Sequence, residues 1–383
     1  MLSCKGHSPM NQEFDLIIVG SGIVGLAHAS VAARQGKRVA VFDRYPRPLG
    51  ASIRNFGMLW PIGQPAGHRL NTALRSRELW LEFLNAAGIA HQVPGCLHAA
   101  YRDDETKVLQ EFATLGPAHG YQVQWLSPEE ATSRSHALKP QGLQGALWSD
   151  TETTIDPRQA LRELPAFLAN QFGVSFHYQT AVTSATTGTI TTGRGVFYAP
   201  QIYICSGEDF ETLYPELLQS SGVTRVKLQM MRTPPQPANW QLGPSLAAGL
   251  TLTHYKSFQI CPSLDALKAR VAEELPDYVK WGIHVMASAT ADNAITIGDS
   301  HEYGLTVEPF NKDFIDQLIL DYLRGFATFA DNSIAERWYG VYAKHPVTDW
   351  VDITPCDGVR IFTSPGGAGM TMSFGLAWEN LNS

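Results

Sequence analysis

Two short apolar runs separated by a stretch of small residues dominate the first fifty positions of the chain. Residues 14–19 (FDLIIV) have the short, apolar, β-branched pattern of a strand buried on both faces, and residues 37–43 (KRVAVFD) are typical of a second strand that ends in an acid. Residues 26–35 between them are small and mostly apolar and end at Gly36, as a helix does. The order predicts a βαβ unit of about 30 residues.

The same kind of pattern predicts elements along the rest of the chain. A Thr-rich segment with two glycine turns, residues 174–199, indicates a small β-meander. Asp156 followed by Pro157 is typical of a helix start. We expect helices over 69–87, 128–135, 157–170, 308–329 and 370–380, and strands over 201–205, 225–232, 251–260, 282–289, 294–297 and 359–363.

Strand–turn patterns typical of nucleotide binding therefore occur at the start, in the middle and at the end of the chain. The simplest arrangement is an α/β fold in which a discontinuous Rossmann-like nucleotide-binding domain carries an inserted mixed, β-rich domain. We expect the first domain to comprise residues 13–88, 149–220 and 335–383, and the second to comprise 89–148 and 221–334.

The first strand is followed directly by Gly20-x-Gly22-x-x-Gly25. These glycines permit a tight turn, close approach of a pyrophosphate to the backbone and close helix–strand packing, and the phosphates then meet free N–H groups at the helix N-terminus. Asp43 ends the second strand, 18 residues after Gly25, where an acid accepts hydrogen bonds from ribose hydroxyls. An acid there favours NAD or FAD over NADP.

Composition excludes several classes of protein. The chain has 383 residues, of which 44% are hydrophobic and 17% charged, so a sizeable core is expected. The formal charge of −7, without a basic block, argues against a nucleic-acid partner and against a polybasic membrane anchor. Five scattered cysteines without C-x-x-C spacing predict neither a disulfide framework nor a zinc site, and suggest a reducing, cytoplasmic location.

Six segments in order resemble one family of flavoenzymes. They are IIVGSGIVGLAHASVAARQGKRVAVFDR (17–44), GASIRNFGMLW (50–60), DPRQAL (156–161), QIYICSGE (201–208), WYGVY (338–342) and GGAGMTMSFGLA (366–377). Together they are similar to the D-amino-acid oxidase, glycine oxidase and sarcosine oxidase superfamily, the DAO family. Residues 51–65 look most like a subgroup associated with phosphonate-degradation genes.

The resemblance implies FAD as the cofactor, so the Rossmann-like domain is expected to be an FAD-binding domain and the inserted β-rich domain a substrate domain. Some relatives bind it covalently through a cysteine of the W-x-G segment, but no cysteine stands there in this chain, so noncovalent FAD is expected. Some relatives have a lysine two residues beyond the final glycine of the last turn, and this lysine assists the reaction of the flavin with oxygen. This chain has Thr371 at that position. The expected FAD contacts are Gly20, Gly22, Ile23, Val24, Gly25, Asp43, Arg44, Ser52, Arg54, Asn55, Val182, Ser206, Gly207, Gly367, Ala368, Gly369, Met370 and Thr371.

The family also implies the reaction, which is oxidation of a C–N bond by hydride transfer to the flavin. The imine formed then hydrolyses to an aldehyde or keto product. Tyr342 stands near the position where amino-acid oxidases have an arginine for the substrate carboxylate. This difference favours another anion, such as the phosphonate of 2-aminoethylphosphonate or its N-methyl derivative. The candidate catalytic and substrate-binding residues are Arg54, Arg232, His254, Lys256, Tyr342 and Lys344.

Alternatives remain open at this point. One is a glycine, sarcosine or D-amino-acid oxidase, and another is a non-catalytic FAD-binding subunit of a larger complex. An aromatic hydroxylase would need a second nucleotide site, which the sequence does not show. The electron acceptor is O2 or another carrier, and the protein is expected to be a monomer or a homo-oligomer. The histidines show no ligand spacing such as H-E-x-x-H, so no metal site is expected.

Overall fold

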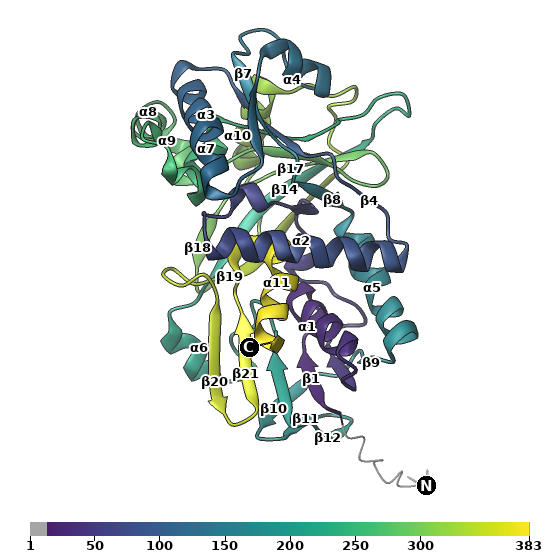
Figure 1. The fold of residues 1–383 in the computed structure, drawn as a ribbon. Helices are drawn as coiled ribbons and strands as arrows, with labels where there is room; N and C mark the ends of the chain where they lie inside the picture. Colours follow the sequence, from purple (N-terminus) through teal and green to yellow (C-terminus); the bar gives the residue numbers. More distant parts are fainter. Residues whose placement is uncertain (1–13, 383) are drawn as a thin grey trace.

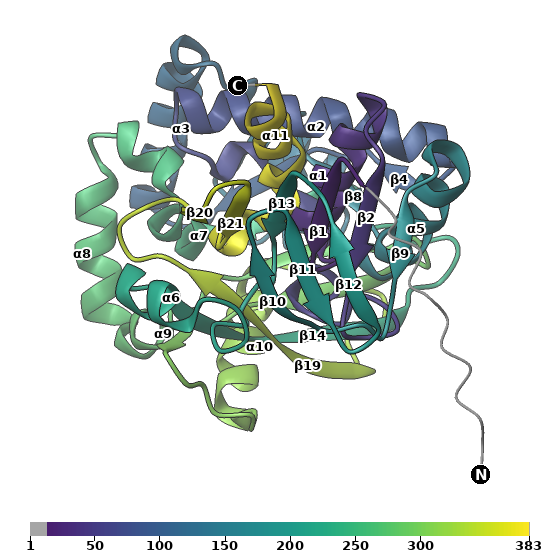
Figure 2. The same cartoon turned by 90° about the horizontal axis from the view of Figure 1, so that it is seen from below.

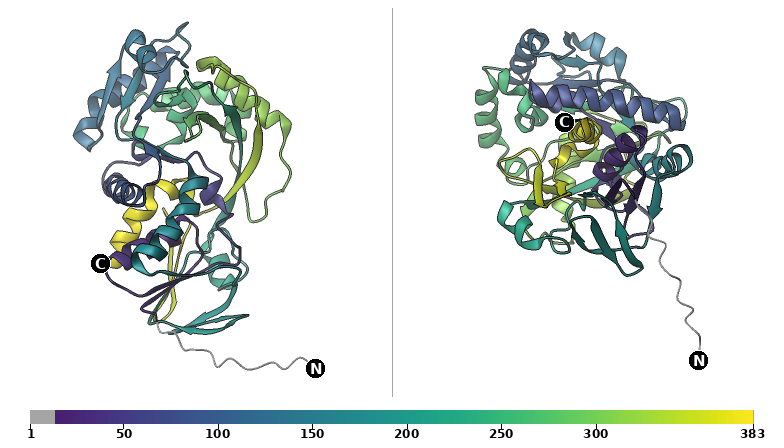
Figure 3. Two further views of the ribbon diagram at one scale, coloured as in Figure 1. Left: turned by 90° about the vertical axis from the view of Figure 1, so that its right-hand side faces the viewer. Right: turned by 60° about the horizontal axis from the view of Figure 1, so that its bottom comes forward.

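A computed structural model describes residues 14–382. The described chain folds into two lobes, seen one above the other in Figure 1 and from the side in the left panel of Figure 3. The lower lobe is built on a six-stranded sheet and the upper lobe on a nine-stranded sheet. Chain segments cross between the lobes several times, as expected for an inserted domain.

The six-stranded sheet contains the predicted βαβ unit. Its order is β20-β21-β13-β1-β2-β9, parallel except for the edge strand β20. Helix α1 begins at Ile23, directly after the glycine turn. The strands are β1 (Leu16–Val19), β2 (Val39–Phe42), β9 (Ser175–His177), β13 (Gln201–Ile204), β20 (Val351–Cys356) and β21 (Val359–Thr363).

Helices cover one face of this sheet, and the predicted meander covers the other. Apolar side chains of four helices pack on one face of β1, β2 and β21. Residues of β10 and β11 pack against the opposite face, as Figure 2 shows. The helices are α1 (Ile23–Arg34), α2 (His68–Ala87), α5 (Pro157–Phe172) and α11 (Gly369–Asn382), and the meander is β10 (Val182–Thr186), β11 (Thr189–Thr192) and β12 (Gly195–Tyr198).

The nine-stranded sheet is mixed and curves over the lower lobe. Its path is β18-β14-β17-β16-β15-β5-β7-β6, and β19 also pairs with β14 along nine residues. The strands are β5 (Cys96–Ala100), β6 (Val123–Leu126), β7 (Gly145–Ser149), β14 (Thr224–Pro235), β15 (Ser245–Ala248), β16 (Met286–Ala289), β17 (Ala294–Gly298), β18 (Glu302–Gly304) and β19 (Glu336–Lys344).

Helices on both faces bury this sheet. Helices α3 and α8 pack on one side, and α4 and α10 on the other. The helices of this lobe are α3 (Asp103–Leu115), α4 (Pro128–Arg134), α7 (Gly249–His254), α8 (Leu264–Glu274), α9 (Pro276–Lys280) and α10 (Asp313–Phe326).

The remaining elements are short. A small sheet between the lobes pairs β3 (Met58–Leu59), β8 (Thr153–Ile155) and β4 (His91–Gln92). Helix α6 spans Pro215–Ser221, and single 3₁₀ turns are η1 (Ala51–Ile53), η2 (Pro61–Gly63), η3 (Gly116–His119), η4 (Lys256–Ile260) and η5 (Gly366–Ala368).

Most predicted elements are present, and two predictions need correction. The strand expected over 251–260 is wrong, because this segment forms α7 and η4. Leu250 and Leu252 are buried in the core of the upper lobe, where one helical turn suffices to bury both. The strand expected from Gly282 begins only at Met286.

The expected boundary at residue 335 also differs from the sheet pairing. Strand β19, which follows it, pairs with β14 in the nine-stranded sheet. That sheet therefore extends to Lys344, and the chain joins the six-stranded sheet only at β20.

Candidate active site

A large cavity of about 700 Å³ lies between the two lobes. Its walls come from the glycine turn before α1, the turn before α11, strands β14 and β19, and the segments around α7 and β17. All the expected FAD contacts line this cavity except Gly25. A Cβ on Gly25 would lie 2.0 Å from the carbonyl oxygen of Gly20, so this glycine permits the strand–helix crossing instead.

The N-terminus of α1 lies at the cavity, and the residue that caps it has no side chain. Gly22 caps the helix without a side-chain hydrogen bond. A Cβ on Gly22 would lie 3.2 Å from Ser52 Oγ, and one on Gly20, which has φ +105°, would lie 2.4 Å from the Cys205 carbonyl oxygen. The amide of Ile23 donates to Ser52 Oγ at 2.9 Å. The remaining space and the positive end of the helix suit a pyrophosphate.

Asp43 lies at the end of β2 beside this turn. Its Oδ2 accepts from the amide of Ser21 at 2.8 Å and from its hydroxyl at 2.6 Å, and Oδ1 accepts from the amide of Tyr45 at 2.9 Å. A carboxylate offers about four acceptor positions, so one remains for a ribose hydroxyl. Arg44, the next residue, is held by an ion pair with Asp209.

The second nucleotide strand and the last glycine turn complete the lower wall. Thr363 at the end of β21 donates to the carbonyl of Gly207 at 2.9 Å. Helix α11 begins at Gly369, so its positive end faces the cavity. The hydroxyl of Thr371 accepts from the amide of Trp60 at 2.9 Å. Thr371 therefore links the last glycine turn to the segment after β3, and it provides no positively charged side chain.

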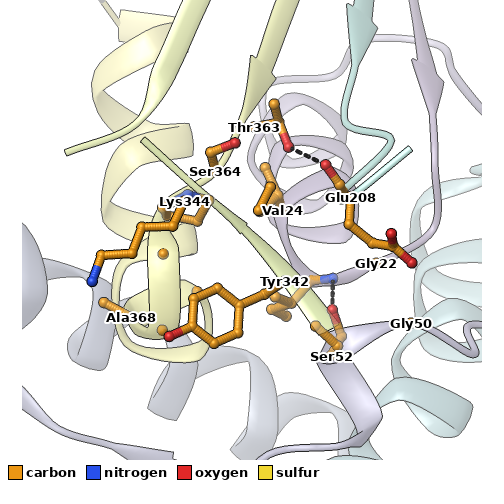
Figure 4. A pocket seen from close by; sticks show the side chains of 18 of the residues that line it. Gly22, Val24, Gly50, Ser52, Glu208, Tyr342, Lys344, Thr363, Ser364 and Ala368 are labelled. Atoms are coloured by element: carbon orange, nitrogen blue, oxygen red, sulfur yellow. Dashed lines mark hydrogen bonds between the residues drawn. The ribbon is translucent and has the colours of Figure 1, made fainter. Parts of the chain in front are cut away.

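Strand β19 places Tyr342 and Lys344 opposite the last glycine turn (Figure 4). A Cβ on Gly367 would lie 3.4 Å from the Tyr342 hydroxyl. Burial raises the pKa of Tyr342 well above its ordinary value, so the phenol stays protonated. Burial also lowers the pKa of Lys344, whose ammonium lies over the ring of Tyr303.

The remaining candidate cations fall into two groups. Arg54, His254 and Lys256 line the cavity. Arg54 follows η1, and its guanidinium donates to the Tyr339 carbonyl at 3.3 Å. His254 and Lys256 lie at the end of α7 and the start of η4, and do not alternate along a strand as expected.

Arg232 is the candidate that the structure does not bring to this cavity. Its guanidinium contacts Asp292 at 2.5 Å and donates to Thr290 at 2.8 Å. It is absent from the cavity wall, and its side chain is committed to these partners. We therefore drop Arg232 from the substrate site.

Sequence reasoning missed several residues of the upper cavity wall. His284 and His301 lie close to His254, and Asp299 and Tyr255 lie beside them. His284 precedes β16 and His301 follows β17, and these two strands form an antiparallel pair. The ends of such a pair meet in space, so the two strands predicted over 282–289 and 294–297 would have brought these histidines together if they had been paired, whereas the spacing of the histidines gives no signal.

Comparison with known proteins gives the family. The family described as FAD dependent oxidoreductase (DAO) matches residues 15–379. Glycine oxidase of Geobacillus kaustophilus is 28% identical over 211 residues, which are 52% of this chain and 55% of that protein. One of the subunits of the opine oxidase of Agrobacterium tumefaciens is 24% identical over 87% of this chain and 82% of its own length.

Solved structures agree on the fold. L-α-glycerophosphate oxidase of Mycoplasma pneumoniae, solved with FAD bound, superposes with a TM-score of 0.74 over 97% of this chain and 94% of that one, at 20% identity. No helix among residues 14–382 is long and apolar enough to cross a membrane. With a family match that spans nearly the whole chain and a cavity lined by the glycine turns, this protein belongs to the DAO family of FAD-dependent oxidoreductases.

Proposed function

We propose that the protein oxidises the C–N bond of a small anionic amine, with an aminoalkylphosphonate as the favoured substrate. The observation that carries this proposal is the set of cations around the cavity. Arg54, Lys256 and Lys344 line the same cavity and come from three different segments of the chain. A phosphonate carries up to two negative charges and is held best by several converging cations.

The residues named above would hold FAD noncovalently, through the glycine turn at α1, Asp43 and the last glycine turn. The chemistry that bound FAD would supply is that of a hydride acceptor for the carbon next to the amine nitrogen. The substrate loses two electrons and two protons and becomes an imine, and water then releases an aldehyde and the amine or ammonia. Either O2 or another carrier removes the electrons afterwards.

The chain's own residues position the substrate. Apolar side chains of β14, Leu228 and Met230, line the cavity, and the Tyr342 hydroxyl lies beside Gly367 of the last glycine turn. This apolar wall excludes water from the reacting carbon. The cations orient the anionic group, so that the amine lies at a fixed distance from it.

Trapping of the product tests the proposal. FAD-loaded protein is mixed with N-methyl-2-aminoethylphosphonate, with glycine or with sarcosine in air, and the aldehyde is trapped and identified. We expect phosphonoacetaldehyde and methylamine from the first compound at a higher kcat/KM than any product of the other two. Preferential turnover of glycine or sarcosine would instead favour a simple amino-acid oxidase.

A non-catalytic FAD subunit remains the second candidate. The Agrobacterium tumefaciens relative, which matches 87% of this chain, is by its name one subunit of an opine oxidase. This candidate predicts that no amine gives a product with the isolated chain.

A further inference from the structure

Three histidines from separate segments meet at the upper end of the cavity. They are His254 at the end of α7, His284 before β16 and His301 after β17. One ring nitrogen from each lies within 4.8 Å of the others. No part of the proposed amine oxidation requires this cluster.

On one of the rings, a hydrogen bond determines which nitrogen keeps its free lone pair. His301 Nδ1 lies 2.8 Å from the carbonyl oxygen of Gly282. A carbonyl only accepts, so Nδ1 carries the hydrogen, and Nε2 of the neutral ring keeps its lone pair. A backbone carbonyl orients many metal-binding histidines in this way.

The second ring is unsatisfied. His284 is 2% exposed, and its Nδ1 is buried without a hydrogen-bond partner among the described residues. A buried polar atom that lacks a partner costs about 1–3 kcal/mol, so an occupant that satisfies it would be favoured.

A buried carboxyl group lies beside the three rings. Asp299 Oδ1 lies 3.1 Å from His284 Nε2, is buried, and accepts no hydrogen bond within residues 14–382. Buried charges in proteins are paired or coordinate metals, so a carboxyl group at this place favours a cation over an anion as the occupant.

Two of the three ring separations agree with ligands on one ion. With zinc–nitrogen distances of about 2.0–2.1 Å, tetrahedral coordination puts imidazole centroids about 5 Å apart. The observed separations are 4.9 Å for His254–His301, 5.3 Å for His284–His301 and 3.8 Å for His254–His284. The short separation involves His254, the exposed member of the cluster, whose ring would shift on binding the ion.

We propose that His254, His284 and His301 bind a divalent transition metal of the zinc type, with one coordination position open to the cavity. In that position the metal would accept an oxygen of the substrate's anionic group, a role that rests on the proposed function. The metal would then supply positive charge at the end of the cavity that lacks the family's arginine.

Zinc binding to the holoenzyme tests the site. FAD-loaded full-length protein is stripped with a chelator and dialysed against Zn²⁺, and bound metal is measured per chain. We expect one equivalent, and His254→Ala should weaken binding by more than about 100-fold, because a direct ligand contributes more than an outer partner. His119→Ala, at an exposed surface turn, is the matched control and should bind normally.

Two results would overturn the metal site. One is the absence of stoichiometric zinc in a protein whose flavin content is normal. The other is unchanged zinc affinity in His254→Ala. Visible absorption of the Co²⁺-loaded protein gives a second readout, and loss of its tetrahedral spectrum in His254→Ala but not in His119→Ala supports the assignment.

The anchoring role is tested separately. Binding of 2-aminoethylphosphonate, followed by its perturbation of the flavin spectrum, should weaken at least tenfold when the metal is removed. Equal binding with and without zinc would overturn the anchoring role. Failure of every amine to give product, with zinc still bound, would instead overturn the proposed function and leave the metal site standing.

Discussion

At the scale of single residues, the glycine turn and the acid after the second strand were predictable because their sequence signal is local. Gly20, Gly22 and Asp43 are recognised by their spacing, and all three line the cavity. The upper wall was not predictable in this way, since His284 and Asp299 come together only through the pairing of β16 with β17. Arg232 shows the opposite error, because a strand position alone does not reveal that Asp292 already holds its charge.

Arg54 gives a test at this scale. Arg54→Ala should raise the KM for an aminoalkylphosphonate about tenfold or more, since a hydrogen bond to a charged group contributes about 1.5–3 kcal/mol. Steady-state kinetics measure the effect. Arg47→Ala is the control, because Arg47 lines the adjacent surface pocket and not the cavity. An unchanged KM in Arg54→Ala would remove this residue from the substrate site.

At the scale of elements, long periodic segments and buried strands were predicted well, and short apolar segments were not. Helix α2 begins one residue from its predicted start, and Asp156 caps α5 through the amides of Arg158 and Gln159. The segment 251–260 was expected to be a strand, but burial of Leu250 and Leu252 against the upper lobe gives a helical turn. Tertiary packing decides such cases.

The βαβ unit carries a prediction about close packing. Gly25→Ala should strongly reduce FAD binding, because the new Cβ would lie 2.0 Å from the Gly20 carbonyl oxygen and displace the turn. The FAD content per chain after purification measures this. Gly193→Ala, where a Cβ would meet open space, should leave the FAD content unchanged. Full FAD content in Gly25→Ala would contradict the role given to the turn.

At the scale of the whole molecule, the two ends of the chain complete one site. Helix α11 packs between α1 and α2, as Figure 1 shows, and Trp80 of α2 donates to the Met370 carbonyl at 2.8 Å. The discontinuous architecture was expected from the order of the motifs. The extension of the upper sheet through β19 was not, because strand pairing over such sequence distances leaves no local signal.

The packing of α11 can be tested with two helical glycines. A Cβ on Gly375 would lie 2.2 Å from the Thr72 carbonyl oxygen, whereas one on Gly325 of α10 would meet open space. Gly375→Ala should therefore lose about 1–3 kcal/mol of stability through overpacking, and Gly325→Ala should gain about 0.5–1 kcal/mol. Thermal unfolding of the two variants measures this, and equal unfolding temperatures would contradict the tight α2–α11 contact.

Anaerobic reduction of the bound flavin tests the central claim most directly. FAD-loaded protein is mixed without oxygen with 2-aminoethylphosphonate, its N-methyl derivative, glycine, sarcosine and D-alanine, and loss of the yellow absorption is followed in time. We expect an aminoalkylphosphonate to bleach the flavin completely and faster than the amino acids. A flavin that stays oxidised with every amine would contradict C–N bond oxidation by this protein.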